Sequence, residues 1–301
     1  MKVVKVIHNP TAGNEEFKKS ELISKIERGG FICKYSSRKK RGWKNLESSI
    51  DFLVAAGGDG TIRSVVKMLL GRKAGQKTWP IALLPLGTAN NIAKTLGISG
   101  ETQEIIESWQ HAKIWKLDIG RIHNLNDGTF FLEGMGFGVL PYLFSEMKKQ
   151  FDPSDGDRDI EINTALALLH QIVLSYEPRH CELQVDGTNH SGKFLMAEVM
   201  NIRSIGPGLM LAPDADPADG EFEIVLLPEK YKDHFATYLT KKIAGDEEEY
   251  RYDTLKGKNI RIIWDGTHVH VDGKVLKMTE STELLIELKE NAVEFLVPNI
   301  P

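Results

Sequence analysis

The chain has 301 residues, a formal net charge of −4, and hydrophobic and charged fractions of 41% and 27%. These values are typical of folded globular proteins and exclude collagen-like, fibrous and disordered classes. The negative net charge argues against a nucleic-acid binder, which needs an excess of Lys and Arg to neutralise phosphates. Two cysteines, Cys33 and Cys181, are too few for a disulfide framework, and we expect free thiols in a reducing cytoplasm.

Neither an export signal nor a membrane span is expected from the apolar runs. The run at 3–7 is short and interrupted by charge, which is unlike a signal peptide. The best internal candidate, 165–169, ends at His170, far below the roughly 20 apolar residues that a span requires. We therefore predict a cytoplasmic protein that is peripheral to the membrane.

Up to about residue 122, short apolar runs alternate with helical patterns, which indicates an α/β domain with a three-layer, mostly parallel sheet. Helices are expected after the first, third and fourth strands, the second of these helices carrying the apolar positions of 62–69, and a further helix is expected at 101–112. The expected strands are Val3–His8, Phe31–Tyr35, Phe52–Ala56, Pro80–Leu84 and Ile114–Ile122.

Beyond residue 122 the pattern changes to paired strands joined by Asp-Gly turns, such as Asp186-Gly187 and Asp272-Gly273. Asp-Gly between apolar runs is a hairpin signal, because glycine supplies the positive φ of tight turns. We predict a β-rich sandwich domain over 123–283, with helices at 160–176 and 231–243. The first domain is predicted to cover 1–122.

The strongest motif is Gly57-Gly58-Asp59-Gly60-Thr61, which ends a strand and opens a helix. Glycines let backbone N–H groups approach phosphate oxygens, and a helix N-terminus adds positive potential. The Asp59 carboxylate fits this site as a Mg²⁺ ligand or as a base that receives a hydroxyl proton. The alternative is a tight turn in which Asp59 is only a helix N-cap.

Two further loops are expected at the same edge of the sheet. Pro85 to Asn91 follows the fourth strand and opens another helix, and Asn9-Pro10-Thr11-Ala12-Gly13 follows the first strand. Because the carboxyl ends of parallel strands meet at one edge, where open α/β folds bind ligands, three such loops predict a phosphate site.

With these motifs, the chain resembles the family of bacterial diacylglycerol kinases and eukaryotic sphingosine kinases. The resemblance extends to Leu211-Ala212-Pro213, Asp219-Gly220 and Val271-Asp272-Gly273. It implies an N-terminal nucleotide-binding domain, a C-terminal β-sandwich with a lipid cleft between the two, and a final segment, 284–301, that returns to the first domain. It also implies ATP as co-substrate, Mg²⁺, and a lipid substrate at a membrane surface.

The resemblance also assigns candidate site residues. Asp59 is the preferred base and Asp272 the reserve. Asp59 and Asp118 are candidate metal groups, and a further Mg²⁺ site maps onto the Asp219 side chain and the carbonyls of Asp216 and Glu221. A hairpin turn is the alternative for Asp219, and a strand-end cap for Asp118. The nucleotide contacts fall on Asn9, Thr11, Gly13, Ser37, Gly57, Gly58, Gly60, Thr61, Thr88 and Asn90.

Two positions depart from the family pattern: Asn91 stands where Asp is usual, and Lys274 where Glu is usual. The chief expectation is phosphorylation of a lipid hydroxyl, most simply diacylglycerol to phosphatidic acid. The alternatives are a lipid-binding or regulatory protein with a degenerate site, and a dinucleotide (NAD) kinase. A homodimer is possible. Two segments keep two interpretations each: 38–41 as a solvated loop or an anionic-lipid contact, and 137–144 as core or acyl-chain cleft.

Overall fold

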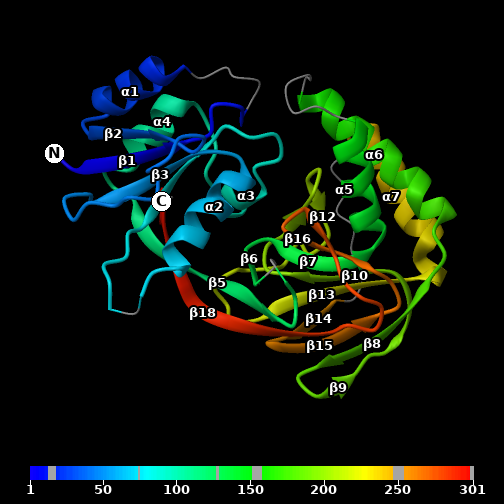
Figure 1. Cartoon of the computed structure of the whole chain (residues 1–301). Helices are drawn as coiled ribbons and strands as arrows, with labels where there is room; N and C mark the ends of the chain where they lie inside the picture. The colour runs from blue at the N-terminus through cyan, green and yellow to red at the C-terminus, as the bar shows by residue number, and fades with distance from the viewer. Residues whose placement is uncertain (13–17, 74, 127–128, 151–157, 247–253, 299–301) are drawn as a thin grey trace. The chain divides into compact units, whose positions relative to one another are not determined.

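The computed structural model describes residues 1–12, 18–73, 75–126, 129–150, 158–246 and 254–298 (Figure 1). The chain divides into two compact units, residues 1–117 together with 292–301, and residues 118–291.

The first unit is built on a parallel sheet in the order β2-β1-β3-β4. Every residue of β3 is buried, which is typical of a parallel strand covered on both faces. Helix α1 packs beside α4, and α2 beside α3. The elements are β1 (Val3–His8), α1 (Lys19–Arg28), β2 (Ile32–Ser37), β3 (Phe52–Gly57), α2 (Asp59–Leu70), β4 (Ile81–Pro85), α3 (Asn91–Thr95) and α4 (Thr102–Ser108).

The last strand, β18 (Glu283–Val297), returns to this sheet. Its residue Phe295 pairs in parallel with Ile81 of β4 and is fully buried. Residues 292–297 therefore belong to the first unit, whereas residues 284–291 of the predicted C-terminal segment belong to the second. The earlier part of β18 pairs with β15 in the second unit.

The second unit is an antiparallel sheet in the order β17-β16-β7-β10-β8-β15-β18, with β13 also pairing β10. Its strands are β5 (Lys113–His123, which begins in the first unit), β6 (Phe130–Phe131), β7 (Gly134–Gly138), β8 (Arg179–Val185), β9 (Thr188–Asn189), β10 (Gly192–Met200), β11 (Ser204–Ile205), β12 (Leu209–Met210), β13 (Phe222–Pro228), β14 (Leu255–Gly257), β15 (Asn259–Trp264), β16 (His268–Val271) and β17 (Lys274–Lys277).

Two apolar clusters lie on opposite faces of these strands. Along β10, Ala197 and Val199 belong to the sandwich core, whereas Met196 and Met200 face the helices, as the alternation of side chains along a strand requires. The helix layer consists of α5 (Val139–Gln150), α6 (Arg158–Ser175) and α7 (Lys232–Ile243), with a short 3₁₀ turn η2 (Glu229–Tyr231) before α7.

The predicted fold class, an α/β domain followed by a β-sandwich domain, is confirmed. The segment 137–144 contains both core and exposed residues. Phe137 stacks on Trp264 in the sandwich core with ring centroids 5.6 Å apart, whereas Tyr142 is 49% exposed. Among the described residues, no helix is long and apolar enough to cross a membrane.

Candidate active site

The register of the first sheet brings four strand ends side by side. His8 pairs with Ser37 on one side and with Ala56 on the other, and Gly57 pairs with Pro85. The chain therefore leaves β1, β2, β3 and β4 at neighbouring points of one edge. The loops after β1, β3 and β4 meet at this edge as expected, and the loop after β2 joins them.

The loops after β3 and β4 are in backbone contact through glycine. A Cβ on Gly87 would lie 2.3 Å from Gly58 Cα, and one on Gly57 would lie 2.3 Å from Thr61 Oγ1. Neither position can hold a larger side chain without a shift of its neighbours. Gly60 differs, because a Cβ there would meet no atom within 4 Å. Its open face, in the first turn of α2, is where an anion can approach the positive end of the helix.

Asp59 joins the same two loops through its carboxylate. Its Oδ2 accepts a hydrogen bond from the Asn91 N–H and its Oδ1 one from the Ile92 N–H, both at 3.1 Å. The side chain thus satisfies two amides at the start of α3, which have no partner inside the helix.

Asn90 holds the second loop in shape. Its backbone is left-handed, with φ 52°, a conformation that Asn tolerates better than most residues. Its Oδ1 accepts from the Gly87 N–H at 3.0 Å, and its Nδ2 donates to the Gly87 carbonyl at 2.7 Å. Asn90 is predicted as a nucleotide contact, but both the oxygen and the nitrogen of its side-chain amide form hydrogen bonds within its own loop.

Asn9 and Thr61 lie against the first glycine loop. The Asn9 N–H donates to the Ala56 carbonyl at 2.9 Å, and Thr11 Oγ1 donates to Asn9 Oδ1 at 3.1 Å. Thr61 is 2% exposed, and its Oγ1 has no hydrogen-bond partner within the described part of the chain. Gly13, also predicted here, lies outside the described residues, and Thr88 is half-buried in the second loop.

Arg38 was not predicted as a site residue, yet it contacts the glycine loop. Its Nη1 donates to the Gly60 carbonyl at 2.9 Å and to Ser64 Oγ at 2.8 Å. The sequence signal was the basic run that begins at this residue, one position after Ser37. The run is therefore not simply a solvated loop, because its first member binds the start of α2.

A cavity of about 470 Å³ opens beside the same edge. Two aromatic residues, Tyr35 and Trp43, and the cations Lys19, Lys40 and Arg41 contribute to its lining, together with Pro10, Ser36, Ser37 and Gly42. The Tyr35 hydroxyl lies 2.9 Å from Nδ1 of His8, and burial lowers the pKa of that histidine. Aromatic faces and cations together suit a ligand that carries a ring and negative charge.

In the second unit, Asp118 binds two backbone amides. Its Oδ2 accepts from the Gly220 N–H at 3.0 Å and its Oδ1 from the Asn291 N–H at 2.7 Å. The side chain is 3% exposed. Burial raises the pKa of Asp118, an effect that the two amides oppose.

The predicted Mg²⁺ turn lies next to Asp118. Asp219 Oδ1 accepts from the Glu221 N–H at 3.0 Å, and Asp219 Oδ2 lies 3.9 Å from Lys256 Nζ. Within the described part of the chain, no three His, Cys, Asp or Glu side chains are grouped to hold a metal. The donor chemistry that fits Mg²⁺ here is thus one carboxylate oxygen, Asp219 Oδ2, with the carbonyls of Asp216 and Glu221.

Asp272 fixes the start of β7. Its Oδ1 accepts from the N–H groups of Glu133 at 2.9 Å and Gly134 at 3.2 Å, and both of its oxygens lie 3.1 Å from the Leu132 N–H. Its own φ is 47°. Lys274, two residues later, is exposed at the start of β17.

Comparisons with known proteins agree with this arrangement of two units. A profile of the diacylglycerol kinase catalytic domain matches residues 3–122, and one of the YegS C-terminal NAD kinase beta sandwich-like domain matches residues 160–294. The first unit therefore resembles the catalytic domain of diacylglycerol kinases, and the second unit resembles the YegS C-terminal domain. The resemblance inferred from the motifs is thereby confirmed.

Individual relatives of this family and its fold are distant in sequence. The diacylglycerol kinase of Bacillus subtilis (strain 168) is 26% identical over 82% of this chain and 80% of its own length. A diacylglycerol kinase structure from Bacillus anthracis superposes with a TM-score of 0.73 at 20% identity, covering 99% of this chain and 97% of that one. An NAD kinase from Archaeoglobus fulgidus, in complex with ATP, gives 0.57 at 15% identity, covering 99% and 94%.

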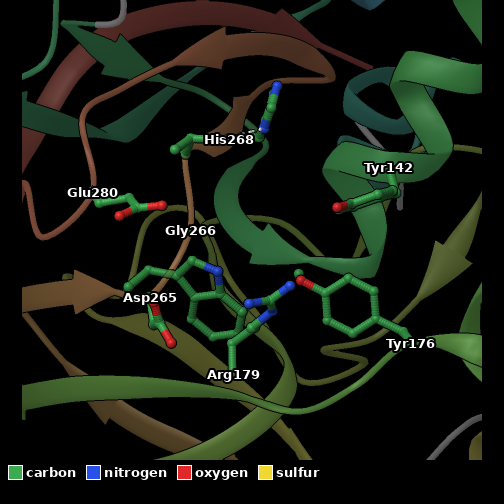
Figure 2. A pocket seen from close by; sticks show the side chains of 10 residues that line it. Tyr142, Tyr176, Arg179, Asp265, Gly266, His268 and Glu280 are labelled. Carbon is green, nitrogen blue, oxygen red and sulfur yellow. Dashed lines mark hydrogen bonds between the residues drawn. The ribbon is translucent and has the colours of Figure 1, made fainter.

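A second cavity, of about 130 Å³, lies next to Gly138 at the end of β7 and His268 at the start of β16 (Figure 2). These are the ends of the two strands that are farther from Asp272. Arg179, Tyr176, Asp265 and Glu280 contribute to its lining, and Arg179 lies beside Tyr176. Because one guanidinium and two carboxylates line the cavity, it favours no single charge of ligand. Tyr142 and Tyr176 close one side with ring centroids 5.4 Å apart.

Proposed function

We propose that this protein transfers the γ-phosphoryl group of ATP, with Mg²⁺, to the hydroxyl of a lipid, most simply converting diacylglycerol to phosphatidic acid. The observation that carries the proposal is the locked pair of glycine loops at Gly58 and Gly87 beside a cavity lined by aromatic and cationic residues. The match to the diacylglycerol kinase catalytic domain and the relatives named diacylglycerol kinase support the lipid as acceptor.

The nucleotide would lie along this sheet edge. An NAD kinase of similar fold has been solved in complex with ATP, which supports ATP as the donor here. The phosphates would face Gly60 and the first turn of α2, and Tyr35 and Trp43 offer faces on which a base can stack. Lys40 and Arg41 would offset the negative charge of the triphosphate.

The acidic residues have proposed roles of two kinds. Asp59 binds the start of α3 and would bind Mg²⁺ or take the hydroxyl proton. Asp219, with the carbonyls of Asp216 and Glu221, would hold a structural Mg²⁺. A bound Mg²⁺ supplies charge neutralisation to the phosphates, and a loose phosphoryl-transfer transition state demands little else beyond positioning.

The acceptor is a bilayer component, so we propose that the protein acts from the cytoplasm as a peripheral enzyme at a membrane surface. Homodimer formation stays a prediction. Lys274 is an exposed cationic side chain at the start of β17. It therefore suits neutralisation of phosphate charge better than acceptance of a proton, and we expect a slower kinase than one that carries Glu there.

Incubation with γ-labelled ATP, Mg²⁺ and lipids extracted from the source cell tests the proposal. Label should appear in a lipid that carries one new phosphate, and NAD offered in a parallel reaction should stay unlabelled. Label in NADP instead would favour the dinucleotide kinase. No label in any acceptor, together with retained lipid binding, would favour the regulatory alternative.

A further inference from the structure

Two buried polar side chains on the helix-facing side of the second sheet have no role so far. Glu198 of β10 and His270 of β16 are each opposite Gly136 of the intervening strand β7. Their neighbours along each strand, Val199 and Val271, point into the sandwich core. Because side chains alternate along a strand, Glu198, Gly136 and His270 form a row across three strands that faces the helix layer.

The glycine in the middle of the row lets the outer two residues meet. A Cβ on Gly136 would lie 2.1 Å from the Glu198 carboxyl carbon. With that space open, Glu198 Oε2 and His270 Nε2 come within 2.7 Å of each other, and both side chains are 0% exposed. We call these two residues the Glu198–His270 pair.

One polar atom of each residue remains unused. Glu198 Oε1 and His270 Nδ1 have no hydrogen-bond partner within the described part of the chain. Leaving such atoms unpaired costs about 1–3 kcal/mol each, so a buried pair of this kind is expected to meet a ligand or an ordered water.

The protonation of the pair decides what that ligand must offer. A net charge is unfavourable at full burial, so the neutral form is preferred, and burial raises the pKa of Glu198 while His270 opposes the change. The neutral pair carries two exchangeable hydrogens, one of which fills the Nε2–Oε2 contact. The other lies on one of the two outer atoms, Nδ1 or Oε1, and leaves the opposite atom as an acceptor. The pair therefore presents one donor and one acceptor at its two outer atoms.

The surroundings of the pair are apolar. Leu140, Leu143 and Met196 are fully buried in the same layer. The ring of Phe144, on α5, meets His270 edge-on with centroids 5.0 Å apart, yet Phe144 is only half-buried. A molecule that displaces Phe144 would place its apolar part among these side chains and its polar end at the pair.

We propose that the Glu198–His270 pair binds the polar end of the lipid substrate, with His270 Nδ1–H donating to an ester or amide carbonyl and Glu198 Oε1 accepting from the hydroxyl. This assignment rests on the proposed function and specifies its substrate class. An acylated polyol or amino alcohol carries a hydroxyl near a carbonyl and matches both atoms. A polyprenol offers a hydroxyl alone and matches them less well.

The test replaces both residues by apolar ones of similar size, Glu198→Met with His270→Leu. Removing a buried polar pair together is often neutral or stabilising, so the double variant should fold, with Tm equal to or above that of the wild type. In mixed micelles its KM for diacylglycerol should rise about tenfold or more, as expected for two lost hydrogen bonds. Its KM for ATP should change by less than about threefold.

Two further variants accompany the double variant. His270→Gln retains a polar atom for Glu198 but none at the Nδ1 position, so it should raise the lipid KM as well, and it replaces the double variant should that one not fold. His268→Gln, on the same strand, is the matched control, because His268 is half-buried and contacts Thr267 instead. Its lipid KM should equal that of the wild type.

The preference for diacylglycerol over a polyprenol should also shrink in the double variant. An unchanged lipid KM in a folded double variant or in His270→Gln would overturn the inference and leave the pair as a structural element that holds a buried water. A wild-type protein that phosphorylates no lipid would instead refute the proposed function, so the two failures are distinguishable.

Discussion

Replacement of Gly87 with alanine tests whether contact between the two glycine loops is required for nucleotide binding. The added methyl group would lie 2.3 Å from Gly58 Cα, and the obstacle is backbone, so one loop must move. Overpacking of this kind costs about 1–3 kcal/mol, and each kcal/mol lowers Tm by about 2–4 °C in a chain of more than 150 residues. Because Gly58 immediately precedes α2, the same shift should weaken the binding of Mg-ATP.

Gly60→Ala is the matched variant, since a Cβ there meets no atom within 4 Å. Alanine inside a helix is more favourable than glycine by about 0.5–1 kcal/mol, so Tm without ligand should hold or rise. The methyl group would occupy the space proposed for phosphate, and the upward shift of Tm by Mg-ATP should shrink.

Thermal denaturation with and without Mg-ATP measures both effects, because a ligand that binds only the native state raises Tm by mass action. The reasoning is refuted if Gly87→Ala keeps the wild-type Tm and the full Mg-ATP shift. A full shift in Gly60→Ala would remove the open face of α2 from the proposed nucleotide site.

Four further predictions concern charged residues. Asp59→Asn should spare much of the ATP binding but lower kcat strongly, and an unchanged kcat would exclude Asp59 from the chemistry. Lys274→Glu should raise kcat on diacylglycerol. A lower kcat in this variant would mean that Lys274 itself contributes to the reaction. Lys40→Gln with Arg41→Gln should raise the Kd of Mg-ATP in calorimetry, whereas an unchanged Kd would leave these cations to solvent or to anionic lipid. The pKa of Asp118 is raised in the native state, which therefore binds the carboxyl proton more firmly than the unfolded state does. Between about pH 3.9 and the raised pKa, the free energy of unfolding should therefore fall as pH rises. Asp118→Asn should flatten this slope in urea titrations, and equal slopes in the two proteins would contradict the assignment.

The meeting of the loops at one sheet edge could be predicted from the sequence. The glycine motif at 57–61 and the segment 85–91 each follow a strand of apolar residues, and parallel strands bring their carboxyl ends together. The observed pairing of Gly57 with Pro85 is the register that this reasoning requires. The assignment of individual nucleotide and metal contacts stays a prediction.

Contacts between distant residues could not be predicted in the same way. Asp59 accepts hydrogen bonds from amides 32 and 33 residues away, and Glu198 meets His270 across 72 residues. Such partners depend on strand register and on a glycine between them, neither of which local periodicity specifies. The contact of Arg38 with α2 could not be predicted for another reason. The sequence does not distinguish one member of a basic run from its neighbours.

The most direct measurement of the central claim is phosphoryl transfer to a defined lipid. Purified protein, Mg-ATP and diacylglycerol in mixed micelles are incubated, and the lipid product is followed by mass spectrometry, with Gly71→Ala as a control on α2, where a Cβ meets only ordinary contacts. The account predicts phosphatidic acid from the wild type and the control, little from Gly87→Ala, and none without Mg²⁺. ADP release with no phosphorylated lipid, from a folded wild-type protein that binds Mg-ATP, would contradict it.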